Sequence, residues 1–219
     1  EDCTHLIVGV STFEQQQSQA PSAYHCRLAD GDTTLVQRFQ GIRSTTGPLA
    51  MADYTGNGRL DLFVGGRFKP AKYPEDARSR LYTNENGTFQ LDRQNSRLLR
   101  EAGLVTSAVF VDYDGDGDQD LLVGRAWDSL VLLENQDGQF EDVSSEVGLA
   151  NQNGWWNGVA TGDFNNDGRP DIVATNWGRN SRYQLEGGRP VKMFYDDFDQ
   201  DRKPEVMESH YDPDLQGYV

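Results

Sequence analysis

Nine residues from Asp112 to Asp120 carry the strongest chemical pattern in this sequence, because they read Asp-Tyr-Asp-Gly-Asp-Gly-Asp-Gln-Asp. Carboxylates stand at loop positions 1, 3, 5 and 9, separated by small or flexible residues. Gly117 at position 6 allows the backbone turn that lets these side chains converge. Oxygen ligands at this density select a hard cation that takes about six to eight of them, Ca²⁺ before Mg²⁺. The segment therefore predicts a calcium-binding loop.

Three further segments repeat this loop along the chain. The copy at 163–171 reads Asp-Phe-Asn-Asn-Asp-Gly-Arg-Pro-Asp and keeps glycine at position 6. The copy at 53–61 has the same spacing with fewer charges. The copy at 197–205 has Arg202 and Glu205 where the others have glycine and aspartate. A motif that returns at intervals along a chain indicates a repeat architecture.

An EF-hand loop shares the first five positions, but it also needs a ligand at position 12 and helical flanks. Position 12 is Val64, Val123 and Ala174 in three of the loops, which excludes an EF-hand there. Only Glu208 fits in the fourth loop, and its flanks read as strands. A solvated acidic turn without metal remains the alternative for each loop.

The acidic composition agrees with cation binding. The net charge is −15, and the ligand-type positions of the loops supply much of it. Without metal the carboxylates of a loop repel one another, and four Ca²⁺ ions would offset about half of the total charge. The acidity argues against nucleic acid as a partner. No stretch approaches about 18 consecutive apolar residues, so no membrane insertion is expected.

The elements that must position these loops are pairs of short strands. Segments of small and β-branched residues precede the loops, at 48–52, 107–111, 158–162 and 191–195. Short apolar runs follow them, at 60–64, 120–123, 171–174 and 206–207. Each loop thus joins the two strands of a hairpin.

A second hairpin follows each of the first two loops, with Asn-Gly at 86–87 and Asp-Gly at 137–138 in its tight turn. Two hairpins per unit make a four-stranded antiparallel sheet, which is the blade of a β-propeller. The sequence therefore predicts an all-β fold, a β-propeller of four-stranded blades with calcium-binding loops in the inner hairpins.

The repeat divides the chain into about five units of a single propeller or propeller fragment, at approximately 1–42, 43–95, 103–145, 154–188 and 189–219. The first unit lacks its loop and first strand, and the last stops soon after the fourth loop. Either the termini complete each other's blade in a ring of about five, or the sequence is part of a larger propeller, which we favour. An insertion at 67–80, rich in Lys, Arg and Pro, lengthens the second unit. The outer hairpin around 181–188 must be abbreviated.

These residues resemble the FG-GAP/VCBS repeats of integrin α-subunit propellers, and the segment 157–173 is especially close. Gly-Trp-Trp-Asn at 154–157, with Asn-Ser-Arg-Tyr at 180–183, resembles the group related to cartilage acidic protein and bacterial ASPIC/UnbV proteins. The resemblance implies a secreted, periplasmic or cell-surface propeller that binds Ca²⁺ and takes part in adhesion or protein interaction.

The resemblance also implies a ligand set for up to four Ca²⁺ ions, one per loop, with position 7 donating its backbone carbonyl. The first loop should bind most weakly because of Thr55 and Asn57, and the geometry of the fourth is open because of Arg202 and Glu205. The expected metal ligands are Asp53, Thr55, Asn57, Arg59, Asp61, Asp112, Asp114, Asp116, Asp118, Asp120, Asp163, Asn165, Asp167, Arg169, Asp171, Asp197, Asp199, Asp201, Lys203 and Glu205.

Two function classes remain at this stage. The first is a non-enzymatic, calcium-stabilised propeller that binds an extracellular protein or glycan, alone or as part of a larger chain or assembly. The second is a propeller enzyme, such as a polysaccharide lyase or glycoside hydrolase, with structural calcium. The sequence contains no Gly-x-Ser-x-Gly elbow, P-loop or Cys-x-x-Cys motif. Because the cage pattern already accounts for the carboxylates, we expect no catalytic residue and no enzyme activity.

The remaining polar and aromatic residues are expected to be structural. The tryptophans should pack between blades rather than form a ligand surface. The arginines after the inner strands should cap or pair, and the three histidines should be isolated. Cys3 and Cys26 are two free thiols or one disulfide; we favour the disulfide because calcium at roughly millimolar concentration is an extracellular condition. The residues concerned are Trp127, Trp155, Trp156, Trp177, Arg67, Arg125, Arg179, His5, His25 and His210.

Overall fold

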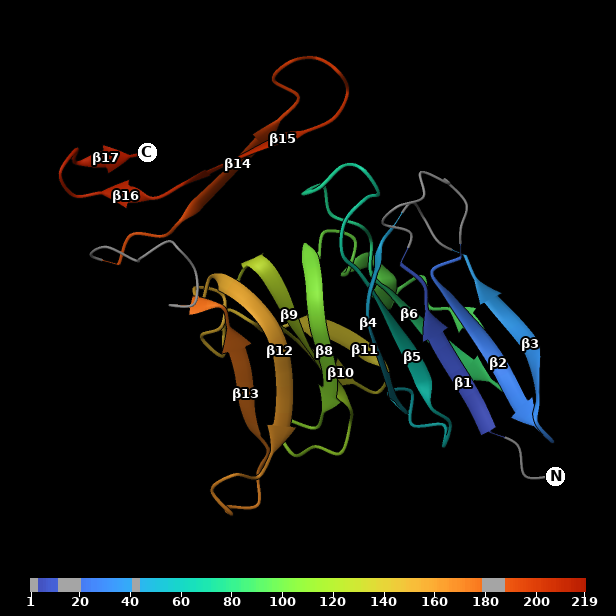
Figure 1. The fold of residues 1–219 in the computed structure, drawn as a ribbon. Helices are drawn as coiled ribbons and strands as arrows, with labels where there is room; N and C mark the ends of the chain where they lie inside the picture. The colour runs from blue at the N-terminus through green and yellow to red at the C-terminus, as the bar shows by residue number, and fades with distance from the viewer. Residues whose placement is uncertain (1–3, 12–20, 41–43, 179–187) are drawn as a thin grey trace.

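The computed structural model describes residues 4–11, 21–40, 44–178 and 188–219, and these residues form an all-β fold. Antiparallel sheets stand side by side, with β1–β3 at one end of the row and β12–β13 at the other (Figure 1). The described part of the chain forms separate open sheets rather than a closed ring. Closure into a propeller therefore remains a prediction.

The second unit forms the four-stranded antiparallel sheet that its sequence predicts, in the order β4-β5-β6-β7. The turn between the last two strands has Asn86 and Gly87 at positive φ, which is the conformation that an Asn-Gly hairpin turn requires. The strands are β4 (Thr46–Ala52), β5 (Asp61–Gly66), β6 (Arg80–Glu85) and β7 (Thr88–Leu91). A 3₁₀ turn, η1 (Asn95–Arg97), follows.

The third unit repeats this arrangement and continues into the fourth. Its strands are β8 (Leu104–Val111), β9 (Asp120–Asp128), β10 (Val131–Gln136) and β11 (Gln139–Asp142). The inner hairpin of the fourth unit follows, with β12 (Gly154–Gly162) paired to β13 (Asp171–Asn176). β9 and β12 run longer than the sequence predicts, and their extensions pair with each other, Trp155 opposite Ala126.

The two ends of the chain carry smaller sheets. The first unit is a three-stranded sheet without an innermost strand, as expected, made of β1 (Thr4–Gly9), β2 (Ala23–Ala29) and β3 (Asp32–Phe39). The fifth unit has two separate hairpins, β14 (Lys192–Asp196) with β15 (Glu205–Ser209) and β16 (Tyr211–Asp212) with β17 (Gly217–Tyr218). Figure 1 shows this unit apart from the row of sheets.

The hydrophobic core lies between neighbouring sheets, because the middle strands bury both faces. In β5, Leu62 packs with Phe39 and Phe89 towards the first unit, while Phe63 packs with Leu121 towards the third. Successive side chains of a strand point to opposite faces, so one strand contributes to two cores. The strands on either side of each core are thereby fixed, and the loops between them are fixed with them.

Burial falls towards the C-terminal end of the described chain. All six residues of β5 are buried, whereas Val173 of β13 is 46% exposed and Phe194 of β14 is 50% exposed. The predicted outer hairpin around 181–188 and the group at 180–183 lie largely outside the described residues, as does Cys3. Cys26 is a free thiol in the structure, so the favoured disulfide between Cys3 and Cys26 was wrong.

Candidate metal centre

All four acidic loops share one set of backbone hydrogen bonds. The carboxylate at position 1 accepts the N–H of position 6, position 5 accepts the N–H of position 7, and the position 9 acid accepts an N–H from position 2 or 3. The bond from the position 6 N–H to the position 1 carboxylate is 2.6 Å long at Asp53, 3.1 Å at Asp112, 2.9 Å at Asp163 and 2.8 Å at Asp197. The loops are therefore one structural motif that occurs four times.

The backbone conformation of the loops explains their glycines. Positions 4 and 6 have positive φ in every loop, and in the second loop Gly115 is at 84° and Gly117 at 99°. This region disfavours any residue with a Cβ atom. The fourth loop nevertheless adopts it, with Gln200 at 64° and Arg202 at 72°. Arg202 thus leaves the shared geometry of the fourth loop unchanged.

The second loop gathers three of its predicted ligands. One carboxylate oxygen each from Asp112, Asp114 and Asp116 lies within 4.8 Å of the others. Asp120 lies outside this group and is fully buried, where it accepts N–H groups of Asn135 and Tyr113 at 2.8 and 2.9 Å. A carboxylate has about four lone pairs, so these bonds leave capacity for a cation.

Burial raises the pKa of the position 9 acids in the first two loops. Desolvation raises the pKa of Asp120 to about 6, and the nearby charges of Asp114 and Asp116 add to the shift. Burial also raises the pKa of Asp61. A bound cation would oppose these shifts because it favours the ionised carboxylate.

An asparagine on the third strand of each complete sheet anchors the position 9 acid. The backbone N–H of Asn84 donates to Asp61 at 2.7 Å, as that of Asn135 does to Asp120. The side chain of Asn84 donates to the carbonyl of Leu60 and accepts the N–H of its own hairpin turn. Asn135 makes the equivalent bonds and also donates to Tyr54 in the preceding unit. Loop, outer hairpin and neighbouring unit are thus connected.

Sequence reasoning did not identify these asparagines. A signal is present in the sequence, because each stands three residues before the glycine of its hairpin turn, Asn84 before Gly87 and Asn135 before Gly138. Their role requires a contact with the end of the acidic loop, which a sequence pattern does not reveal.

The first and third loops have fewer convergent acids. In the first loop, the Thr55 hydroxyl and backbone N–H both donate to Asp61. Thr55 therefore holds the Asp61 carboxylate in place and contributes no carboxylate of its own. In the third loop, the side-chain amide of Asn165 donates to Asp167 at 3.1 Å and to Asp171 at 3.4 Å. Each loop keeps its predicted ligands close together through such bonds.

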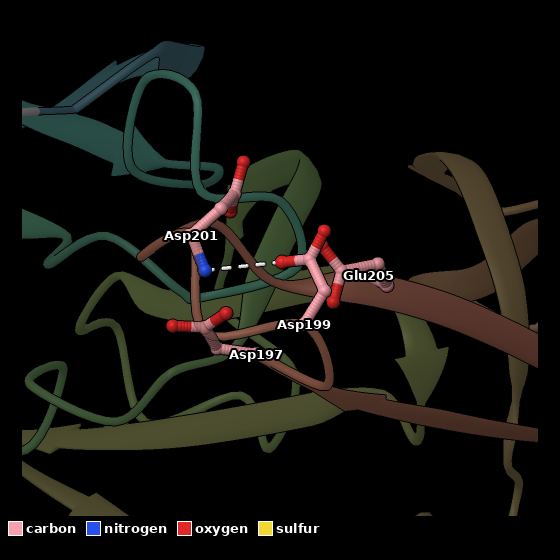
Figure 2. Close-up of side chains that lie close together, drawn as sticks. All are labelled: Asp197, Asp199, Asp201 and Glu205. Atoms are coloured by element: carbon pink, nitrogen blue, oxygen red, sulfur yellow. Dashed lines mark hydrogen bonds between the residues drawn. The ribbon is translucent and has the colours of Figure 1, made fainter.

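The fourth loop forms the largest acid group among the described residues. Asp197, Asp199, Asp201 and Glu205 each offer one oxygen, all within 4.8 Å of one another (Figure 2). Oδ1 of Asp197 is buried and accepts no hydrogen bond from any part of the chain that the structure describes. A buried carboxylate oxygen without a donor, beside three other acids, suits a hard cation. The fourth loop therefore fits Ca²⁺ at least as well as the second.

Three of the remaining expectations can be compared with the structure. His25 is buried, and its Nε2 lies 2.7 Å from Nδ1 of His5, so the expectation of isolated histidines was wrong for this pair. Arg125 makes a salt bridge to Asp128 at 3.0 Å, as expected of these arginines. Trp127 of the third unit packs against Trp155 of the fourth as expected, with ring centroids 5.0 Å apart. Trp177 instead contacts Trp155 within the same unit, with centroids 4.7 Å apart, and is 43% exposed.

Comparison with known proteins agrees with the repeated loops. The family model of the FG-GAP-like repeat matches the chain twice, over 53–123 and 112–174, which together cover more than half of it. The chain belongs to the FG-GAP repeat family. No curated protein matches this FG-GAP chain at a significant level. Within the described residues, no helix has the length and apolarity needed to cross a membrane.

Proposed function

We propose that this FG-GAP chain is a calcium-stabilised propeller segment that mediates binding or adhesion outside the cytoplasm without catalysing a reaction. The observation that carries the proposal is the fourfold acidic loop, placed each time between two inner strands. A cation there ties the ends of a hairpin that packs against its neighbours. Its binding free energy then adds to the stability of the fold by linkage.

The ligand sets differ enough to rank the loops. Ca²⁺ prefers several carboxylate oxygens, and affinity rises with the number of charged ligands. The second and fourth loops gather three and four carboxylates and should bind most tightly. The first, with only Asp53 and Asp61 as acids, should bind most weakly.

Calorimetric titration of the metal-free protein with Ca²⁺ tests this part of the proposal. Wild type should bind up to four ions, and Asp114→Asn and Asp199→Asn should each remove one of the tighter sites. Glu101→Gln, a change outside every loop, should leave the titration unaltered. Titrations in which Ca²⁺ gives no heat and no saturation would remove the basis of the proposal.

Membership of the FG-GAP family supports binding rather than catalysis, since the family is generally non-catalytic. A secreted, periplasmic or surface location fits the calcium requirement and remains part of the proposal. Integrin-like adhesion and kinship with the cartilage acidic protein group also remain proposals. Turnover in a screen of polysaccharides would favour the lyase or glycosidase alternative instead.

A further inference from the structure

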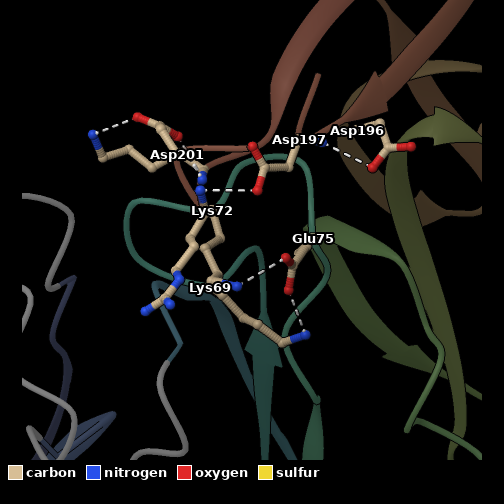
Figure 3. A network of polar contacts seen from close by, with 8 residues as sticks. Lys69, Lys72, Glu75, Asp196, Asp197 and Asp201 are labelled. Atoms are coloured by element: carbon tan, nitrogen blue, oxygen red, sulfur yellow. Dashed lines mark hydrogen bonds and ion pairs between the residues drawn. The ribbon is translucent and has the colours of Figure 1, made fainter. Parts of the chain in front are cut away.

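Two departures from the repeat meet at one place in the structure. The insertion at 67–80 lengthens the second unit, and Arg202 replaces the position 6 glycine only in the fourth loop. Together they border a hollow of about 290 Å³. Figure 3 shows the polar contacts around it, with Lys72 and Glu75 of the insertion and Asp197 of the fourth loop. Its lining includes Lys72 and Glu75 from the insertion, with Tyr195, Asp197, Arg202 and Lys203 from the fifth unit.

On the insertion side of the hollow, two lysines share the carboxylate of one lining residue, Glu75. Lys72 lies 3.3 Å from the carboxylate of Glu75, and Lys69 lies 2.9 Å from the other oxygen of the same group. One carboxylate therefore serves two ammonium groups. The Lys72 side chain is 48% exposed, so it can reach a further anion.

Arg202 of the fifth unit lines the same hollow. Its backbone is held at positive φ while its N–H donates to Asp197 at 2.8 Å. Within the described residues, its guanidinium has no hydrogen bond or ion pair. An arginine at a backbone position that disfavours side chains, in the lining of a hollow, is the kind of strain that concentrates at functional sites.

The hollow also borders the acid group of the fourth loop, because Asp197 belongs to both. The buried, donor-free Oδ1 of Asp197 marks where positive charge is needed. A cation held there would place a third positive centre beside Lys72 and Arg202. Three positive centres around one hollow can hold a single carboxylate by charge-assisted contacts.

We propose that this hollow binds a sugar acid, with its carboxylate between the cation of the fourth loop and the side chains of Lys72 and Arg202. The proposal rests on the proposed cation binding and names a ligand class for the same region. The volume lies at the lower end of small-molecule sites, which suits one ring rather than an extended chain. Tyr195, 50% exposed, offers an aromatic face to that ring.

Calorimetry with galacturonic acid as the probe tests the proposal in the calcium-loaded protein. Galactose, which has the sugar ring without the carboxylate, and free glutamate, which has carboxylates without the ring, are the control ligands. Galacturonic acid should bind saturably, the two controls about tenfold more weakly, and all binding should disappear in EDTA. Lys72→Gln and Arg202→Gly should each weaken galacturonic acid by about tenfold. Arg100→Gln, an exposed change outside every loop and outside the hollow, should not.

Parallel Ca²⁺ titrations separate the two proposals. Arg202→Gly restores the glycine of the other loops, so it should retain the fourth calcium site while losing the sugar acid. If the protein binds Ca²⁺ but not galacturonic acid, the sugar-acid proposal alone is overturned. The same holds if the protein binds glutamate as tightly as galacturonic acid, or if the Arg202→Gly variant binds galacturonic acid as tightly as wild type does. If wild type and Asp199→Asn bind the same number of Ca²⁺ ions, the fourth loop holds no cation. That result overturns both the calcium proposal and the sugar-acid proposal at this loop.

Discussion

The backbone N–H of Asn135 donates a 2.8 Å hydrogen bond to the buried carboxylate of Asp120, and this contact ties the second acidic loop to the outer hairpin of its own sheet. The same bond joins Asn84 to Asp61 in the preceding unit. The acid at position 9 therefore has a structural role that does not require a cation. The acids at positions 1, 3 and 5 are the ones that lie towards solvent.

Replacing Asp120 should destabilise the metal-free protein. Asp120→Ala leaves the buried N–H of Asn135 and that of Tyr113 without an acceptor, at a cost of about 2–4 kcal/mol. Asp114→Ala, an exposed change in the same loop, should cost less than about 0.5 kcal/mol. Urea unfolding in EDTA measures both. If both variants lost the same small unfolding free energy in EDTA, Asp120 would have no structural role apart from metal binding.

Asn135 should contribute more than its counterpart Asn84. Both side chains form hydrogen bonds within their own sheet, but Asn135 is fully buried and also donates a 2.8 Å hydrogen bond to the carbonyl of Tyr54 in the preceding unit. Asn135→Ala should therefore cost about 2–4 kcal/mol in the free energy of unfolding, and Asn84→Ala about half of that. A larger loss for Asn84→Ala would contradict the inter-unit role.

The glycines at position 6 should be needed for conformation rather than for space. No atom lies within 4 Å of a Cβ built on Gly117, yet its φ is +99°. Gly117→Ala should thus destabilise the protein by about 1 kcal/mol, and Arg202→Gly should stabilise the fourth loop by a similar amount. Thermal unfolding of both variants checks the opposite signs. A stabilising Gly117→Ala would disprove the argument.

The buried histidine should make stability fall on mild acidification. Burial, and to a lesser extent the neighbouring His5, lower the pKa of His25 below the usual 6.5. The unfolded chain then takes up a proton first, so this contribution is intact above about pH 6.5 and is lost as pH falls through the folded-state pKa. Unfolding free energies between about pH 5 and 7.5 should decline less steeply in His25→Leu than in wild type. Parallel curves would exclude His25 as the cause.

The sequence was sufficient for the inner hairpins and their loops, because each is a local pattern. The alternation around Asp61 and the tight turn at Asn86 and Gly87 each specify a strand or turn without distant contacts. The turn at Asn86 and Gly87 joins β6 to β7, as the sequence predicts. Membership of the FG-GAP family rests on the same local residues.

Long-range contacts could not be read in the same way. The burial of Asp120 depends on Asn135, and the pairing of His5 with His25 depends on the register of two strands. Arg202 suggested an altered loop because its residue type is unfavourable there, but the hydrogen bonds of the loop hold its backbone in the shared conformation. Only the fold brings Lys72 near that loop.

The central claim is that cations in the acidic loops stabilise the fold. Thermal unfolding of one preparation, first stripped with excess EDTA and then returned to about millimolar Ca²⁺, tests it most directly. The account predicts a reversible and saturable rise in Tm with Ca²⁺, reduced in Asp114→Asn and in Asp199→Asn. An identical Tm in EDTA and in Ca²⁺, with complete metal removal verified by elemental analysis, would contradict it.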